Sequence, residues 1–190
     1  MATTDKASPR DRLLDAAAML SYRDGVSIGV EALCRAAGVS KRSMYQLFDS
    51  KDEMLAASLE RGLPRYEAQL LPGDEDAGTP RERILGVFAL LEKASAQADY
   101  HGCPYLAALV ELKDPEHPAS VVAAAAKERL KSFFRTQGRQ GGAADPELLA
   151  RQLLLVFDGA SARAGAHVET LDDGLTTVTA GALLDAAGMQ

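Results

Sequence analysis

Helix-start signals recur along this 190-residue sequence and constrain its fold more than any other feature. Residues 8–11, Ser-Pro-Arg-Asp, place a serine before a proline and an acid, which is the pattern of a capped helix N-terminus. Similar signals occur at residues 50–53, 79–82 and 145–147. Aromatic residues make up 5% of the chain, tryptophan is absent and no segment has a confident strand pattern. The sequence therefore predicts an all-α fold.

Caps, glycines and apolar spacing predict where the individual helices lie. Pro64 falls inside the fourth helix, so we expect a kink or a break near Gly62. Residues 72–78, Pro-Gly-Asp-Glu-Asp-Ala-Gly, are turn formers and predict a linker, and residues 138–144 predict a flexible loop. The expected helices cover residues 9–25, 30–37, 40–48, 51–70, 79–95, 104–112, 119–136, 146–167 and 173–187.

Charge and cysteine content exclude several classes of protein. Two cysteines, Cys34 and Cys103, cannot make a disulfide scaffold in a chain of this length. The first twelve residues are polar and charged, and no apolar run approaches the roughly 20 residues that a membrane-spanning helix needs. We therefore expect a cytoplasmic protein that does not enter a membrane. The formal net charge of -6 argues against a chain that coats nucleic acid through bulk charge.

A local basic region nevertheless lies between residues 35 and 51. This region contains four basic residues and one acid, Asp49, so its local charge is +3. The basic residues are Arg35, Lys41, Arg42 and Lys51. Here two short predicted helices are joined through Gly38 and Val39, as in a helix-turn-helix whose second helix enters the major groove. Four basic residues on exposed helix ends are more often simply solvated. Spacing, caps and turn together favour a DNA-binding interpretation.

The stretch from Gly29 to Leu55 resembles the DNA-binding signature of the TetR family of bacterial transcriptional regulators. The similarity includes the Ala-Gly-Val-Ser turn at residues 37–40, Tyr45 followed by Phe48, and the Ser-Lys-x-Glu-x-Leu helix start at residues 50–55. The remaining two thirds of the chain resemble the family in being helical, with Gly-Cys-Pro and Asp-Pro-Glu patterns found in one of its regulatory-domain groups. Gly29 stands where the family usually has a capping Ser or Thr, and Ser27 could substitute for that hydroxyl.

The resemblance implies an N-terminal three-helix helix-turn-helix DNA-binding domain and a larger C-terminal helical ligand-binding and dimerisation domain. We expect the first over residues 1–50, a connecting helix over 51–71 and the second over 72–190. Leu33, Val39, Leu47 and Phe48 would form the core of the small domain. The resemblance, with the donors that bases and phosphates accept, assigns DNA contacts to Ser27, Gly29, Ser40, Lys41, Arg42, Ser43, Tyr45, Gln46 and Lys51.

The resemblance also implies a homodimer, a palindromic operator in double-stranded DNA and a small-molecule effector. The interface would lie on the last two helices, although an apolar stripe there could equally be core within one subunit; its residues would be Leu149, Leu153, Val156, Ala160, Ala182 and Leu183. The effector pocket would lie among the helices from residue 79 to 136 and the start of the next, although each apolar residue there is individually more often core. Its candidates are Phe88, Leu91, Tyr100, Cys103, Tyr105, Leu109, Phe133, Phe134 and Phe157.

Other chemistry has little support in the sequence. His101 lies near Cys103, but further ligands at zinc-type spacing are missing, so we expect no metal and no cofactor. Arg163 and His167 could bind an acidic effector or could face solvent. No phosphate loop, zinc-protease motif or nucleophile elbow occurs, which argues against an enzyme. The leading hypothesis is a ligand-released repressor, and the alternative is an all-helical binding protein that does not touch DNA.

Overall fold

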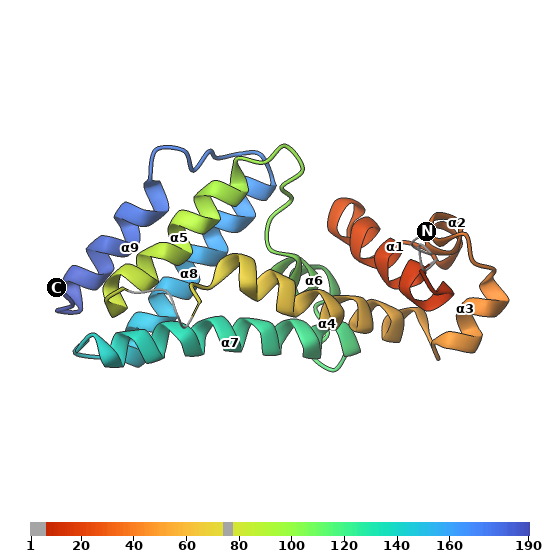
Figure 1. The fold of residues 1–190 in the computed structure, drawn as a ribbon, viewed down its shortest axis with the longest axis horizontal. Coiled ribbons are helices and arrows are strands. Elements are labelled where there is room, and N and C mark those ends of the chain that lie inside the picture. Colours follow the sequence, from red (N-terminus) through yellow and green to blue (C-terminus); the bar gives the residue numbers. More distant parts are fainter. Residues whose placement is uncertain (1–6, 74–77) are drawn as a thin grey trace, which may run out of the picture. The chain divides into compact units, whose positions relative to one another are not determined.

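The computed structural model describes residues 7–73 and 78–190, and within these ranges the chain forms nine α-helices and no strand (Figure 1). The predicted all-α fold is therefore confirmed. Residues 74–77 of the predicted linker and the first six residues lie outside the described ranges. The helices are α1 (Pro9–Asp24), α2 (Val30–Ala37), α3 (Lys41–Leu47), α4 (Lys51–Leu70), α5 (Pro80–Ser95), α6 (Pro104–Leu112), α7 (Pro118–Gln140), α8 (Pro146–Gly165) and α9 (Leu175–Ala186).

Contacts within the chain define two compact units. The first, here the N-terminal unit, comprises Met1–Gly62 together with Ala107–Ala124, and the second, the C-terminal unit, comprises Leu63–Leu106 and Ala125–Gln190. Most of α6 and the first turns of α7 thus belong to the same unit as α1, α2 and α3.

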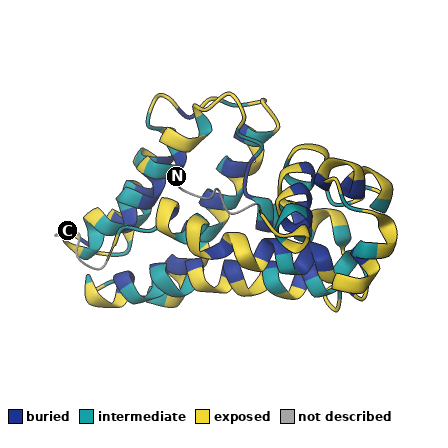
Figure 2. Cartoon of the chain, turned by 45° about the vertical axis from the view of Figure 1, so that its right-hand side comes forward, coloured by how far each residue is buried: buried dark blue, intermediate teal, exposed yellow. Residues whose placement is uncertain are grey.

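The core of the N-terminal unit is built from one face each of α1, α2, α3 and the start of α4 (Figure 2). Leu13 of α1, Met44 of α3 and Met54 of α4 are completely buried, and Leu33 and Phe48 join them as predicted. The prediction that Leu47 belongs to this core is wrong, because its side chain is 38% exposed. In a helix of only seven residues, Met44 already supplies the inward side chain.

A glycine and an arginine end α2 in the way that a helix-turn-helix requires. Gly38 adopts the left-handed conformation, with φ 61° and ψ 39°, and the N–H of Val39 donates to the carbonyl of Cys34. Arg12 of α1 donates its Nε–H to the carbonyl of Ala37 at 3.0 Å. The carbonyls of Cys34, Arg35 and Ala37 at the end of α2 therefore each accept a hydrogen bond, which fixes the turn into α3.

Helix α4 runs through Pro64 without a break, so the predicted break near Gly62 does not occur. A proline inside a helix leaves the carbonyl four residues earlier without its donor. Pro64 and Glu60, the residue that carries this carbonyl, are both exposed, so water can replace the lost bond.

The predicted loop over residues 138–144 begins too early, because α7 continues to Gln140. Gly138 is buried in the last turns of α7, where α8 begins beside it. A Cβ atom at Gly138 would lie 3.4 Å from Leu149 Cδ2 and 3.6 Å from Pro146 Cα. This glycine therefore permits close helix packing rather than flexibility, a role that depends on residues distant in sequence.

Helices α5, α8 and α9 pack against one another in the C-terminal unit. Thr79 and Glu82 form the predicted capping box at the start of α5. The start of α9 is held by Glu92 of α5, whose carboxylate accepts the backbone N–H groups of Thr176 at 3.0 Å and Thr177 at 2.9 Å, and both threonine hydroxyls. A carboxylate from another helix thus supplies the cap that Gly174 cannot.

Candidate nucleic-acid interface

The recognition helix predicted from sequence is α3, and its first turn is held by a serine. Ser40 Oγ accepts the backbone N–H of Ser43 at 3.0 Å, and the two hydroxyls lie 2.8 Å apart. Ser40 adopts the extended conformation of an N-cap residue. The start of α3 is consequently fixed, with hydroxyl groups and free backbone N–H groups at its positive end.

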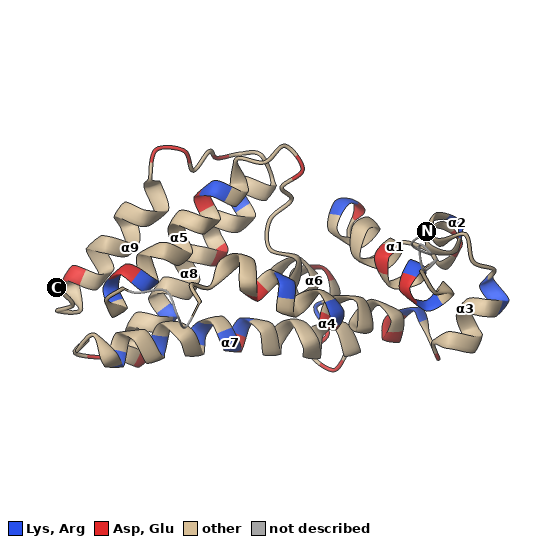
Figure 3. Ribbon diagram, viewed as in Figure 1, with Lys and Arg blue, Asp and Glu red and all other residues tan. Residues whose placement is uncertain are grey.

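Burial divides α3 into an inward and an outward face. Met44 is completely buried, whereas Lys41, Arg42 and Gln46 are exposed and Tyr45 is 50% exposed. In Figure 3 a blue segment, which marks basic residues, lies at one end of this helix. The outward face combines two cations, a phenol and an amide, which are the groups that donate to phosphates and base edges.

The start of α2 departs from the arrangement expected of a serine cap. Gly29 is the N-cap residue, with extended backbone angles and no side-chain hydrogen bond, and Ser27 is exposed beside it. No side chain therefore caps the first N–H groups of α2, and a helix start without a side-chain cap favours an anion.

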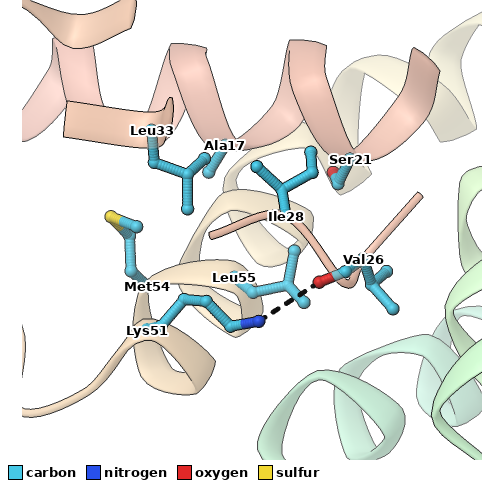
Figure 4. A pocket seen from close by; sticks show the side chains of 8 residues that line it. All are labelled: Ala17, Ser21, Val26, Ile28, Leu33, Lys51, Met54 and Leu55. Atoms are coloured by element: carbon cyan, nitrogen blue, oxygen red, sulfur yellow. Dashed lines mark hydrogen bonds between the residues drawn. The ribbon is translucent and has the colours of Figure 1, made fainter. Parts of the chain in front are cut away.

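Lys51 already makes a hydrogen bond within the protein. Its ammonium donates to the carbonyl of Val26 at 3.3 Å and is half-buried at the edge of a small cavity (Figure 4). The cavity measures about 10 Å³, room for about one water molecule, so it is too small for an organic ligand. Lys51 would have to give up this bond, or share it, to bind a phosphate. The residues lining this cavity are Ala17, Ser21, Val26, Ile28, Leu33, Lys51, Met54 and Leu55.

Most of the predicted effector residues lie together inside the C-terminal unit. The rings of Phe88 and Phe134 are stacked at 5.8 Å, and Phe157 meets Phe88 edge-on at 6.5 Å. Phe133 contacts Phe134, and Leu91 is buried on the same helix as Phe88. Leu109 instead belongs to the N-terminal unit.

The tyrosines and Cys103 form a second cluster in the same unit. Tyr66 donates its hydroxyl to Cys103 Sγ at 3.1 Å, its ring meets Tyr105 at 5.0 Å, and Tyr100 shares a hydrogen bond of 2.9 Å with Ser161. Burial is the main reason why the pKa values of Tyr66 and Tyr105 lie above those of exposed tyrosines, so both phenols are neutral at physiological pH.

The sequence analysis did not single out Ser161, Lys127 or Tyr66 as candidate site residues of this unit. Ser161 is completely buried and Lys127 is 8% exposed. Ser161 follows Phe157 by one turn of α8, so it falls on the inward face that the phenylalanine already marks. That spacing is the signal that could have identified it.

The residues predicted for a dimer interface separate by burial. Leu149 and Leu153 are completely buried in the subunit, whereas Val156, Ala160 and Leu183 are partly exposed and Ala182 is exposed. For Leu149 and Leu153, the alternative that the apolar stripe is core within one subunit is therefore correct. The same helices carry other apolar side chains that face outward, namely Leu148 (48% exposed), Leu155 (73%), Leu175 (44%) and Val178 (71%).

The remaining candidates show ordinary surroundings. His101 and His167 rings lie 6.2 Å apart, and within the described ranges His, Cys, Asp and Glu side chains form no group of three that could hold a metal. Arg163 pairs with Glu169 at 2.9 Å, and His167 lines an open hollow of about 640 Å³ beside the loop before α9. Cys34 is buried, which raises the pKa of its thiol and fits a small core residue.

This geometry defines a class of protein: an α-helical chain with a helix-turn-helix whose second helix carries exposed hydrogen-bond donors. Residues 13–58 match the family model described as bacterial regulatory proteins of the tetR family. A solved structure of a TetR transcriptional regulator from Streptomyces avermitilis is 60% identical, covers 97% of this chain and 100% of its own, and superposes with a TM-score of 0.94. The chain belongs to the TetR family of DNA-binding transcriptional regulators.

Two further relatives extend the similarity. A TetR-family regulator from Streptomyces coelicolor shares the fold, with a TM-score of 0.82 at 23% identity over 94% of this chain and 95% of its own. An uncharacterised HTH-type transcriptional regulator from Mycobacterium tuberculosis is 37% identical over 92 residues, which span 45% of this chain and 46% of that protein. These relatives are transcriptional regulators and not enzymes. In the described part of the chain, every helix is too short or too polar to cross a membrane.

Proposed function

We propose that the protein is a homodimeric repressor that binds a palindromic operator and is released from it by a small-molecule effector. The observation that carries the DNA-binding part is the two-sided α3, with buried Met44 beneath exposed Lys41, Arg42, Tyr45 and Gln46. Because its target is chromosomal DNA, the protein acts in the cytoplasm.

Each exposed residue of α3 has a chemically distinct role in this proposal. Arg42 can donate two hydrogen bonds to a guanine edge or to a phosphate, and Gln46 can pair with adenine. Tyr45 offers its hydroxyl to a phosphate and its ring to a sugar or a thymine methyl group. Lys41, with Ser40 and Ser43, lies at the positive end of the helix, where phosphate is favoured.

The start of α2 supplies a second anion site in this proposal. The backbone N–H groups near Gly29, with Ser27 and Lys51 close by in sequence or structure, would bind the phosphates that flank the groove. The bond from Lys51 to Val26 would then serve to orient the lysine in the absence of DNA.

Dimerisation would use the outward apolar stripes of α8 and α9. Leu155 and Val178 are more than two thirds exposed in one subunit, which is costly for apolar side chains unless a partner covers them. Val156, Ala160, Ala182 and Leu183 border these stripes and would complete the contact. A two-fold axis would place two copies of α3 on one face of the duplex and so require a palindromic operator.

Effector binding would use the C-terminal unit, around the phenylalanine and tyrosine clusters. The effector can release DNA only to the extent that it binds the DNA-incompetent state more tightly than the competent one. Of the predicted pocket residues, Phe88, Leu91, Tyr100, Cys103, Tyr105, Phe133, Phe134 and Phe157 lie in this unit.

The experiment that tests the proposal replaces Arg42 and Tyr45 by alanine, singly and together. Both side chains are exposed, so the free energy of unfolding of each variant should lie within about 0.5 kcal/mol of that of the parent. We expect the free energy of binding to operator DNA to become less favourable by about 1–3 kcal/mol for each lost contact. Arg163→Ala, which removes an exposed cation from the C-terminal unit, is the matched control. If the double variant keeps the parent's operator affinity, α3 does not carry DNA binding; if the parent itself does not bind DNA, the alternative of a binding protein that does not touch DNA is favoured.

A further inference from the structure

Lys127 of α7 is a buried cation inside the C-terminal unit. It is 8% exposed, its ammonium forms an ion pair with Asp158 of α8, and the nitrogen lies 4.8 Å from the centre of the Phe157 ring. A cation at this distance over an aromatic face is attracted by the electrons of the ring. The Lys127 ammonium thus contacts one carboxylate and one aromatic ring.

Stability alone is a weak reason for such a pair. Removing two charges from water costs about as much as their attraction returns, and apolar residues of similar size often stabilise equally well. Burial raises the pKa of Asp158 even though Lys127 lowers it, which shows how far this carboxyl is desolvated. Buried charges with shifted pKa values are found preferentially at functional sites.

The surroundings continue the pattern along α8. Ser161 lies one turn beyond Asp158 and bonds Tyr100, which belongs to the cluster of Tyr66, Tyr105 and Cys103. Burial raises the pKa of Tyr66 and Tyr105, so these two phenols are neutral at physiological pH, and the cluster presents aromatic faces and hydroxyl oxygens. Both are favourable neighbours for an organic cation.

We propose that Asp158 and Phe157 form the receptor for an effector that carries an organic ammonium group, and that Lys127 occupies this receptor in the absence of effector. This inference deepens the proposed function, on which its consequence for DNA binding rests. The effector's ammonium would replace that of Lys127, and its apolar part would lie toward the aromatic clusters.

A cationic effector fits the pair better than an anionic one because the two side chains differ in reach. Lys127 has a four-carbon stem that can swing its ammonium toward solvent, whereas the short side chain of Asp158 cannot leave. An anion paired with Lys127 would leave Asp158 buried without a counter-ion. The Asp158 side chain is 23% exposed, so a ligand can reach it from solution.

The test compares three probes of one size on the full-length protein: n-hexylammonium, hexanoate and 1-hexanol. The thermal midpoint and the binding isotherm are measured for the parent, for Lys127→Met and for Asp158→Asn. Asp172→Asn, which removes an exposed carboxylate in the loop before α9, is the control for charge. Neither readout involves DNA, so the outcome does not depend on the proposed repressor function.

We expect n-hexylammonium to raise the midpoint of the parent and of Asp172→Asn, while the other two probes do not. Lys127→Met should bind n-hexylammonium about tenfold more tightly, because the competing internal ammonium is gone. Asp158→Asn should lose the response. If Lys127→Met does not fold, the parent and Asp158→Asn still decide the matter.

Two results would overturn the inference. A midpoint raised by hexanoate and not by n-hexylammonium would make Lys127 the anchor of an anionic ligand. Equal responses to all three probes, in the parent and in Asp158→Asn, would leave the pair a purely structural one. A normal ammonium response without any DNA binding would instead refute the proposed function and leave this site standing.

Discussion

The carboxylate of Glu111 accepts the backbone N–H of Val26 at 2.7 Å, so α6 holds the turn that joins α1 to α2. Lys51 binds the carbonyl of the same residue, and the two charged side chains thus hold Val26 from both sides of its backbone. In the same unit, His117 accepts the N–H of Ala119 through Nδ1, which leaves the proton on Nε2, 3.4 Å from the carboxylate of Asp52. The end of α6 and the start of α7 are therefore tied to the helices that carry the DNA-facing residues.

Gly25 should tolerate alanine less well than Gly38 does. Gly25 has φ 90° and ψ 172°, a region that only glycine occupies readily, and a Cβ there would lie 2.6 Å from Glu111 Oε2. Gly38 has left-handed angles that alanine can adopt, with open space around it. We expect Gly25→Ala to lower the free energy of unfolding by about 2–3 kcal/mol and Gly38→Ala by about 1 kcal/mol. Urea unfolding of both variants measures the difference, and equal costs would contradict this reading of the turn.

Gly165 should be the least replaceable glycine within a helix. A Cβ at Gly165 would lie 2.5 Å from Gly102 N and 2.5 Å from the carbonyl carbon of His101, so backbone would have to move. We expect Gly165→Ala to cost about 2–3 kcal/mol of unfolding free energy. Gly86→Ala is the matched control, since a Cβ there would meet only Pro72 Cγ at 3.5 Å. This variant should gain about 0.5–1 kcal/mol in free energy of unfolding. A stable Gly165→Ala variant would mean that this approach is looser than described.

Glu92 should matter more than an ordinary surface acid. Replacing it by alanine leaves two backbone N–H groups at the start of α9 without their acceptor. We expect a loss of about 2 kcal/mol in unfolding free energy, with Glu128→Ala, an exposed acid of α7, close to neutral. Thermal and urea unfolding report the difference. Similar effects for the two variants would argue against this capping role.

Placing an aspartate at Leu155 or Val178 should separate the proposed dimer. Each side chain is largely exposed in the single chain, so the fold should survive while a charge is forced into the apolar contact. Analytical ultracentrifugation should then show a monomer, and operator affinity should fall sharply. Val121→Asp, at an apolar residue that is 55% exposed on α7, should leave the association unchanged. Dimers that persist in Leu155→Asp and Val178→Asp would place the interface elsewhere.

Local chemistry is the part of this fold that sequence predicts well. The caps at Ser8, Ser40 and Thr79 and the left-handed Gly38 each depend on three or four neighbouring residues, and each predicted helix start agrees with the structure within about two residues. The outward face of α3 was equally predictable, because one buried Met44 fixes which side points to solvent.

The errors arise where packing between distant residues decides. Gly138 continues a helix because α8 packs against it, and Leu47 is exposed because Met44 already fills the core. The same limit applies to Lys51, whose bond to Val26 depends on a turn 25 residues away. An apolar stripe likewise does not reveal whether its partner is the same chain or a second copy, as Leu153 and Leu155 illustrate.

The most direct measurement is fluorescence anisotropy of the protein on the DNA upstream of its own gene, with unrelated DNA as competitor, over a range of salt concentrations. If each subunit neutralises three or four phosphates, log affinity against log salt should have a slope of roughly -5 to -7 for the dimer. We expect specific binding with that slope, weakened by Arg42→Ala. If no DNA, whether from this region or from a genome-wide selection of bound fragments, is preferred over the competitor, or if the salt response is flat, the central claim is contradicted.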